Sequence, residues 1–196
     1  MSEKSSAKTG KTDGKRIPKP ATAKRLENIA LYYLQRYAAS SESLRRVLKR
    51  RVAKSVYHHD TDPAEGAEFV EDIIRRFLAS GLLDDSIYAE GQVKSLFRRG
   101  LSQRAIQNRL MEKGVDRDII ETQLRALVDE NPEPDLKAAI AFARRRRLGP
   151  FRTTEQRPDR RQRDLASLAR GGFDFATAKK VIDAEDEFAL EELLGD

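Results

Sequence analysis

The chain has 196 residues, of which 39% are hydrophobic and 36% charged, a composition that favours a helical protein with thin cores over one with a single large core. It contains no Cys, which excludes a disulfide framework, a thiolate metal site and a Cys nucleophile and favours a reducing cytoplasm. No segment approaches the roughly 18 apolar residues that a transmembrane helix requires, so we expect a cytoplasmic protein without membrane contact.

The formal net charge of +6 is concentrated at the N-terminus. Residues 1–25 hold eight basic groups against two acidic groups, and the remaining residues carry 30 of each sign. That neutral part is polarised, because residues 134–163 hold ten basic and three acidic groups while residues 183–196 hold seven acidic groups and no base. Local patches therefore indicate partners better than the total charge does.

Residues 1–24 are rich in Lys, Ser, Thr, Gly and Pro and contain almost nothing apolar. Such a segment cannot bury enough surface to offset the entropy lost on ordering. We therefore predict a disordered basic tail that ends where the first apolar repeat begins.

A first three-helix module is expected over residues 25–82. From Leu26, apolar residues recur at i, i+3, i+4 and i+7, which predicts an amphipathic helix. Ser40-Ser41-Glu42 supplies the N-cap of a second helix, and a looser stretch, residues 55–62, leads to a third helix that begins at Pro63.

The cycle repeats in a second module, residues 83–132, and a third, residues 133–183. In the second, the predicted helices begin at Asp84 or Asp85, at Ser102 and at Asp116. The segment from Leu110 to Gly114-Val115-Asp116 superposes on Leu168 to Gly172-Phe173-Asp174 at an offset of 58 residues, which indicates an internal repeat.

These patterns predict an all-α fold, since no stretch shows sustained strand alternation. A unit of about 50 residues has a marginal core alone, so three tandem three-helix modules should pack end to end as an elongated, crescent-like array. The acidic C-terminal tail, residues 184–196, places Phe188 and three leucines among its carboxylates. We hypothesise that this tail folds back over the arginine-rich connector and masks it.

The chain resembles the RecX family of bacterial regulators of the RecA recombinase over roughly residues 25–183. Three patterns carry the resemblance: Gly81-Leu82-Leu83-Asp84-Asp85 with Tyr88-Ala89, Ser102 through Ile106 and Leu110 to Lys113-Gly114-Val115, and Gly172-Phe173 before the last helix. It implies three tandem modules and a non-enzymatic modulator, usually an inhibitor, that binds the RecA filament on single-stranded DNA. Filament growth, strand exchange and co-protease activity in DNA repair would then be limited. We expect a monomer that uses no cofactor.

Five residues of these patterns are expected to be structural: Asp84, Asp85, Tyr88, Gly114 and Gly172. Adjacent carboxylates can perform acid/base or metal chemistry, but at the start of a helix they satisfy free N–H groups and complement the dipole. Tyr88 is expected to pack against a neighbouring module. With no Ser/His/Asp set, phosphate loop or metal cluster in the sequence, we predict no catalytic or metal site.

Two basic sets are the candidate contacts to the filament or to DNA. The stronger set comprises Arg144, Arg145, Arg146, Arg147 and Arg152, and the lesser set comprises Arg98, Arg99, Arg104, Arg109 and Lys113. Such residues can bind phosphates or an acidic protein surface, but they can equally complement a helix C-terminus or form a solvated face. An alternative function is therefore that of a helical regulatory protein that binds DNA directly through its arginine-rich segments. For the filament-binding protein, we expect at most a weak direct contact with DNA.

Overall fold

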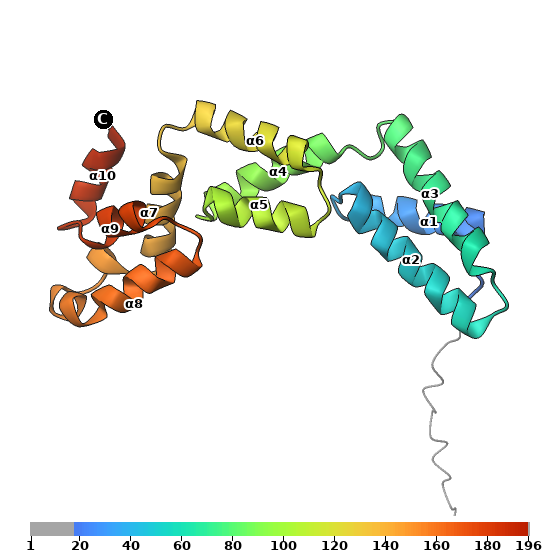
Figure 1. Cartoon of the computed structure of the whole chain (residues 1–196), viewed down its shortest axis with the longest axis horizontal. Coiled ribbons are helices and arrows are strands. Elements are labelled where there is room, and N and C mark those ends of the chain that lie inside the picture. Colours follow the sequence, from blue (N-terminus) through green and yellow to red (C-terminus); the bar gives the residue numbers. More distant parts are fainter. Residues whose placement is uncertain (1–17, 196) are drawn as a thin grey trace, which may run out of the picture.

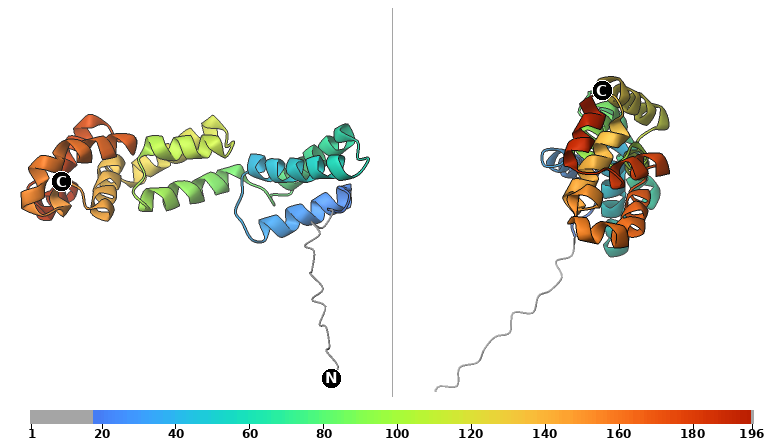
Figure 2. Two further views of the ribbon diagram at one scale, coloured as in Figure 1. Left: turned by 90° about the horizontal axis from the view of Figure 1, so that it is seen from below. Right: turned by 90° about the vertical axis from the view of Figure 1, so that its left-hand side faces the viewer.

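The computed structural model describes residues 18–195, and within this range it contains helices and no strand. Three bundles follow one another in a bent row (Figure 1). The row is long when seen from below and narrow when seen end-on (Figure 2). The predicted all-α, elongated array of three three-helix modules is confirmed.

Module 1 consists of α1 (Ala23–Leu34), α2 (Ser41–His58) and α3 (Pro63–Ala79) around a core of buried leucine, isoleucine and valine side chains. The expected loose stretch after residue 54 is helical up to His58, so α2 is longer than predicted. Asp62 caps α3, whose first residue is proline as expected.

The predicted disordered tail falls largely outside the described residues, which begin at Pro18. Ala21 is buried, and its N–H donates to the Ser55 hydroxyl at 2.8 Å. His59 Nε2 lies 2.6 Å from the carbonyl oxygen of Pro18. The last part of the expected tail, from residue 18, thus packs on α2 because side chains about 40 positions later bind its backbone, which composition alone does not reveal.

Module 2 consists of α4 (Asp85–Arg98), α5 (Gln103–Glu112) and α6 (Arg117–Glu130). Asp84 is the N-cap of α4, where its carboxylate accepts hydrogen bonds from the N–H groups of Ser86 at 2.8 Å and Ile87 at 3.0 Å. After α5, Gly114 adopts a φ of +72°, a left-handed conformation that ends the helix and favours glycine.

Module 3 consists of α7 (Pro134–Arg146), two short 3₁₀ turns, η1 (Gly149–Phe151) and η2 (Thr154–Gln156), then α8 (Arg157–Arg170) and α9 (Phe175–Ile182). The acidic segment that follows contains a further helix, α10 (Glu187–Gly195), which the sequence analysis did not predict. Leu190 anchors it, with 1% exposure, in the core shared by α7, α8 and α9. The C-terminal segment is therefore part of module 3, and its single buried leucine explains why apolar periodicity was too weak to reveal it.

The two joints between modules repeat one carboxylate contact. Asp85, the first residue of α4, accepts hydrogen bonds from Ser41, the first residue of α2, at its N–H (2.7 Å) and its hydroxyl (2.6 Å). Asp135, in the first turn of α7, accepts one from the N–H of Gln103, the first residue of α5, at 2.8 Å. In each joint a carboxylate of the later module caps the second helix of the earlier module.

The joints also repeat a contact between a serine and a helix end. The N-cap Ser40 donates its hydroxyl hydrogen to the Lys113 carbonyl at 2.5 Å, and the N-cap Ser102 donates to the Gly171 carbonyl at 2.8 Å. Each accepting carbonyl directly precedes a left-handed glycine, Gly114 or Gly172, that lies against the earlier module. The two interfaces therefore have the same construction, as expected of stacked repeats.

The joints differ in their apolar packing. Phe97 contacts the cores of modules 2 and 3, and Arg145 Nη1 donates to the Arg99 carbonyl at 2.5 Å across the same joint. Between modules 1 and 2, by contrast, lies an open groove of about 490 Å³ lined by apolar side chains such as Leu82 and Tyr88. The second joint is thus the more tightly packed of the two.

Candidate functional site

The second helices of the three modules, α2, α5 and α8, lie along the same edge of the array, the lower edge in Figure 1. All three are basic: α2 carries six Lys and Arg against one acidic residue, α5 two against one, and α8 five against two. On the upper edge, α3 and α6 each carry two basic and four acidic residues, and α10 carries three acidic residues and no base. The three second helices thus carry a net positive charge, whereas α3, α6 and α10 carry a net negative charge, so the lower edge can attract a polyanion.

The basic surface of α2 is a feature that the sequence analysis missed. Arg45 and Lys49 pair with Glu71 of α3 at 3.0 and 3.2 Å. Partial burial acts to raise the pKa of Glu71, but the hydrogen bonds from Arg45 and Lys49 outweigh it and lower this pKa below its usual value. Beyond them Arg50, Arg51 and Lys54 are exposed, and none pairs with an acid among residues 18–195. The density of Lys and Arg over residues 41–58 was the signal that could have identified this surface.

The lesser basic set falls on module 2. Arg98 and Arg99 end α4 beside the joint with module 3, whereas Arg104, Arg109 and Lys113 lie on or directly after α5. All five are exposed, and within the described part of the chain their side chains form no ion pair. This set remains available to a partner, with α5 providing the larger share.

The four consecutive arginines point in different directions, as successive positions on a helix must. Arg144 Nη2 lies 3.7 and 3.6 Å from carboxylates of Glu187 and Glu191 on α10, and the Arg146 guanidinium lies 4.5 Å from the centre of the Phe142 ring. Arg145 bonds across the joint to module 2. Arg147 ends α7 with a φ of +53° and is exposed, with no side-chain hydrogen bond or ion pair in the described range. Three of the four therefore have intramolecular roles.

Arg152 lies in a different environment from the rest of its set. Its guanidinium donates to both carboxylate oxygens of Asp164 at 2.7 and 2.9 Å, and Asp164 is only 2% exposed. Hydrogen bonding to this carboxylate raises the pKa of Arg152. Asp164 also accepts the Gly149 N–H at 3.0 Å, so the pair fixes the turn between α7 and α8. The structure thus places Arg152 in an internal ion pair that leaves its donors little access to a partner.

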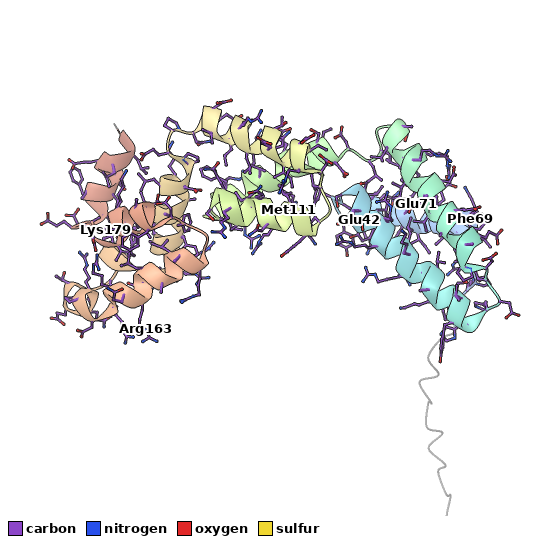
Figure 3. The ribbon with its side chains drawn as sticks, viewed as in Figure 1. Glu42, Phe69, Glu71, Met111, Arg163 and Lys179 are labelled. Atoms are coloured by element: carbon purple, nitrogen blue, oxygen red, sulfur yellow. The ribbon has the colours of Figure 1, made fainter. Side chains whose placement is uncertain are left out.

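The arginines of α8 include some with intramolecular partners and some that are exposed. Arg161 forms two hydrogen bonds of 2.7 Å with Asp183, and Arg157 donates to the Pro150 carbonyl at 2.8 Å and to the Glu185 carbonyl. Arg160 and Arg163 are exposed, and Figure 3 shows Arg163 pointing away from the bundle at the lower edge. The free cations of α8 thus lie on the same edge as those of α2 and α5.

The five motif residues lie at helix starts and joints. Asp84 and Asp85 cap α4 and α2, while Gly114 and Gly172 lie against α2 and α5 of the preceding modules. Tyr88 is half-buried beside the open groove between modules 1 and 2, and this burial raises the pKa of its hydroxyl. Among the described residues no three His, Asp or Glu side chains group as metal ligands, and no helix is long and apolar enough to span a membrane.

Comparison with known proteins adds a family likeness. A family model described as RecX, second three-helix domain, matches residues 84–124. The regulatory protein RecX of Myxococcus xanthus (strain DK1622) is 42% identical over 175 residues, which cover 89% of this chain and 92% of that protein. The regulatory protein RecX of Agrobacterium fabrum (strain C58 / ATCC 33970) is 36% identical over 169 residues, covering 86% and 87%.

Solved structures resemble most of the array. A crystal structure of regulatory protein RecX matches with a TM-score of 0.59 and 22% identity over 82% of this chain and 71% of that chain. The crystal structure of RecX from Lactobacillus salivarius matches with a TM-score of 0.56 and 19% identity over 82% and 94%. At these identities the likeness supports the fold.

Proposed function

The chain belongs to the RecX family of regulatory proteins, and we propose that it is a non-enzymatic inhibitor of the RecA recombinase. It acts in the cytoplasm as a monomer. It binds the RecA filament on single-stranded DNA and limits filament growth, strand exchange and co-protease activity.

The observation that carries this proposal is the row of basic second helices along one edge of three similar modules. A filament presents the same surface at regular intervals, and a tandem array can engage several of these surfaces at once. Weak contacts made by each module then combine, because the second and third contacts are intramolecular. The free cations that would contribute include Arg50, Arg104, Arg109 and Arg163.

The proposal is tested by adding substoichiometric protein to RecA and measuring DNA-dependent ATP hydrolysis and strand exchange. Inhibition is expected, and it should weaken in an Arg109→Glu, Arg163→Glu variant because two modules lose attraction for the filament. Charge reversal at Arg125 and Arg75, which lie on α6 and α3, is the matched control and should leave inhibition unchanged. If neither reaction is affected and the protein does not bind filaments, the proposal fails.

A second candidate function is direct DNA binding through the arginine-rich segments, which the unpaired cations of α2 and α8 favour. This function predicts tight binding to naked DNA, with no requirement for RecA and a steep dependence on salt. Residues 26–196 carry equal numbers of basic and acidic groups, and a neutral chain is weakly attracted to naked DNA, which argues for the filament as the main partner. Affinity for naked and RecA-coated strands, measured at the same salt concentration, separates the two functions.

A further inference from the structure

Tyr57, in the last turn of α2, has the most exposed large apolar side chain in the described part of the chain, at 83%. It lies on the face of α2 opposite the buried stripe formed by Leu44, Leu48 and Val52. An aromatic ring placed in water contributes nothing to the core, and exposed aromatic side chains are typical of contact surfaces.

The residues around this ring are basic. Arg50 and Lys54 precede Tyr57 by seven and three positions, so all three side chains lie on one face of the helix. Arg51 lies on the adjacent flank and is also exposed. The His58 ring meets Tyr57 edge-on at a centroid distance of 4.8 Å, which restricts the ring without covering it.

We propose that Arg50, Arg51, Lys54 and Tyr57 form a binding site for single-stranded nucleic acid, in which a base stacks on Tyr57 and phosphates pair with the cations. Stacking on an aromatic ring combined with a cationic track is how proteins bind single strands without reading their sequence. A duplex is excluded as the main ligand because its bases are already stacked and paired. An acidic peptide would use the cations but would leave the ring exposed.

The dimensions and surroundings fit a short segment of a strand. At about 1.5 Å rise per residue, Arg50 and Tyr57 are about 10 Å apart along the helix, a length of a few nucleotides. Pro18, the first described residue, lies beside His59 at this end of α2.

Tyr57 has no counterpart on the other second helices. Apart from Met111, which is 47% exposed, the large apolar side chains of α5 and α8 that the structure describes are not exposed. The proposed site is therefore confined to module 1, whereas the basic edge extends over all three modules. It goes beyond inhibition of RecA because it requires neither RecA nor the other modules, and it gives the second candidate function, direct DNA binding, a defined site and ligand class.

The test measures binding of the full chain to a fluorescent oligo(dT) strand, without RecA, by fluorescence anisotropy at low salt. Tyr57→Ala should weaken binding by about 5-fold or more, as expected for the loss of one stacked base, while Tyr57→Phe keeps the ring and should remain within about twofold of wild type. Tyr32→Ala is the matched control, since Tyr32 is 56% exposed but lies on α1, outside the proposed site, with the Arg36 guanidinium 4.5 Å from the centre of its ring. Lys54→Ala should reduce the slope of log affinity against log salt by about 0.7, which Tyr57→Ala should not.

An abasic strand of the same length separates stacking from charge. Wild type and Tyr57→Ala should bind this strand equally, because it offers phosphates without bases. The proposal is overturned if Tyr57→Ala binds oligo(dT) as wild type does, or if it weakens binding to both strands equally. It is also overturned if the substitution weakens only binding to RecA filaments, since Tyr57 would then be a protein contact. Because RecA is absent from the first assay, failure of this site and failure of the proposed function remain distinguishable.

Discussion

Asp85 binds Ser41 through two hydrogen bonds, from the serine N–H at 2.7 Å and from its hydroxyl at 2.6 Å. The two residues are the first of α4 and α2, so a carboxylate of module 2 lies at the positive end of a module 1 helix. Apolar contact is sparse at this joint, where the open groove lies, and this polar contact therefore has a large share in holding modules 1 and 2 together.

Asp85→Ala should lower the free energy of unfolding by about 1–2 kcal/mol, because the Ser41 N–H and hydroxyl at the start of α2 lose their acceptor and the joint loses two hydrogen bonds, while the N-cap Ser40 remains. Amide hydrogen exchange at Ser41 should accelerate, and thermal unfolding should report the loss of stability. Glu90→Ala on the same helix is the control, since among residues 18–195 Glu90 forms one exposed pair, with Lys94, and its loss should change stability by less than about 0.5 kcal/mol. Equal stability of the two variants would show that the capping contact is not needed.

Gly81→Ala and Gly100→Ala should differ in cost although both glycines have nearly the same φ, +72° and +73°. A Cβ on Gly81 has no neighbour within 4 Å, so only backbone strain of about 1–2 kcal/mol is expected. On Gly100 the Cβ would lie 2.9 Å from the Phe142 nitrogen and 3.0 Å from the Ala138 oxygen, backbone atoms that cannot move aside. We expect a further 1–3 kcal/mol and a loosened joint between modules 2 and 3, measurable by urea unfolding and small-angle scattering. Similar costs for the two variants would contradict the close approach of α7.

Arg152→Ala should destabilise module 3 by about 3–5 kcal/mol, because it leaves the Asp164 carboxylate buried without its cation. Arg147→Ala removes an exposed, unpaired cation and should leave thermal unfolding unchanged while weakening filament binding. Comparing unfolding temperature with filament affinity for the two variants checks this division. If the Arg152→Ala protein is as stable as wild type but binds filaments more weakly, Arg152 is a filament contact and not a structural residue.

These arginines show what sequence reasoning could and could not reach. Helix starts at Ser40, Ser102 and Asp116 were predictable because capping and apolar periodicity act between residues a few positions apart. The 58-residue repeat similarly identified the modules. Partners such as Asp164 for Arg152 depend on how η1 turns the chain, and no local pattern encodes that turn.

A run of charged residues in the sequence does not show whether their side chains are free to bind a partner. The run from Arg144 to Arg147 attracted attention in the sequence, yet most of its members have intramolecular partners. The cations of α2 were less conspicuous, since apolar residues separate them into one pair, one triplet and a single lysine. Only the packing of α2 on α3 shows that Glu71 pairs with some of these residues and leaves Lys54 and its neighbours free.

Substituting Glu187 and Glu191 with Gln should raise affinity for single-stranded DNA or filament by about twofold to threefold at low salt, and the gain should vanish at high salt. The reason is that both carboxylates lie near Arg144, whereas the buried Leu190 keeps α10 in place. Asp129→Asn with Glu130→Gln makes the same charge change on α6 and is the control. If the control raises affinity equally, net charge alone accounts for the effect and α10 does not mask Arg144.

Asp135 and Asp183 should respond to pH in opposite directions. Burial raises the pKa of Asp135, and the hydrogen bond from the Gln103 N–H opposes this only in part. A carboxyl group whose pKa is raised in the folded state stabilises the fold at pH values below its unfolded-state pKa of about 3.9. This stabilisation is lost as the pH rises through the folded-state pKa. Asp135→Asn keeps an acceptor for Gln103 without a charge, so its stability relative to wild type should increase between pH 4 and pH 7.

For Asp183, the hydrogen bonds from Arg161 lower the pKa, so the contribution is present above about pH 4 and is lost as pH falls through the folded pKa. Asp183→Asn should therefore be less stable than wild type at pH 7, and the difference should shrink as the pH approaches 3. Urea unfolding of both variants and wild type at several pH values measures these differences. If both variants changed in the same direction with pH, a general effect of net charge would explain the result, because local burial at one site and an ion pair at the other require opposite slopes.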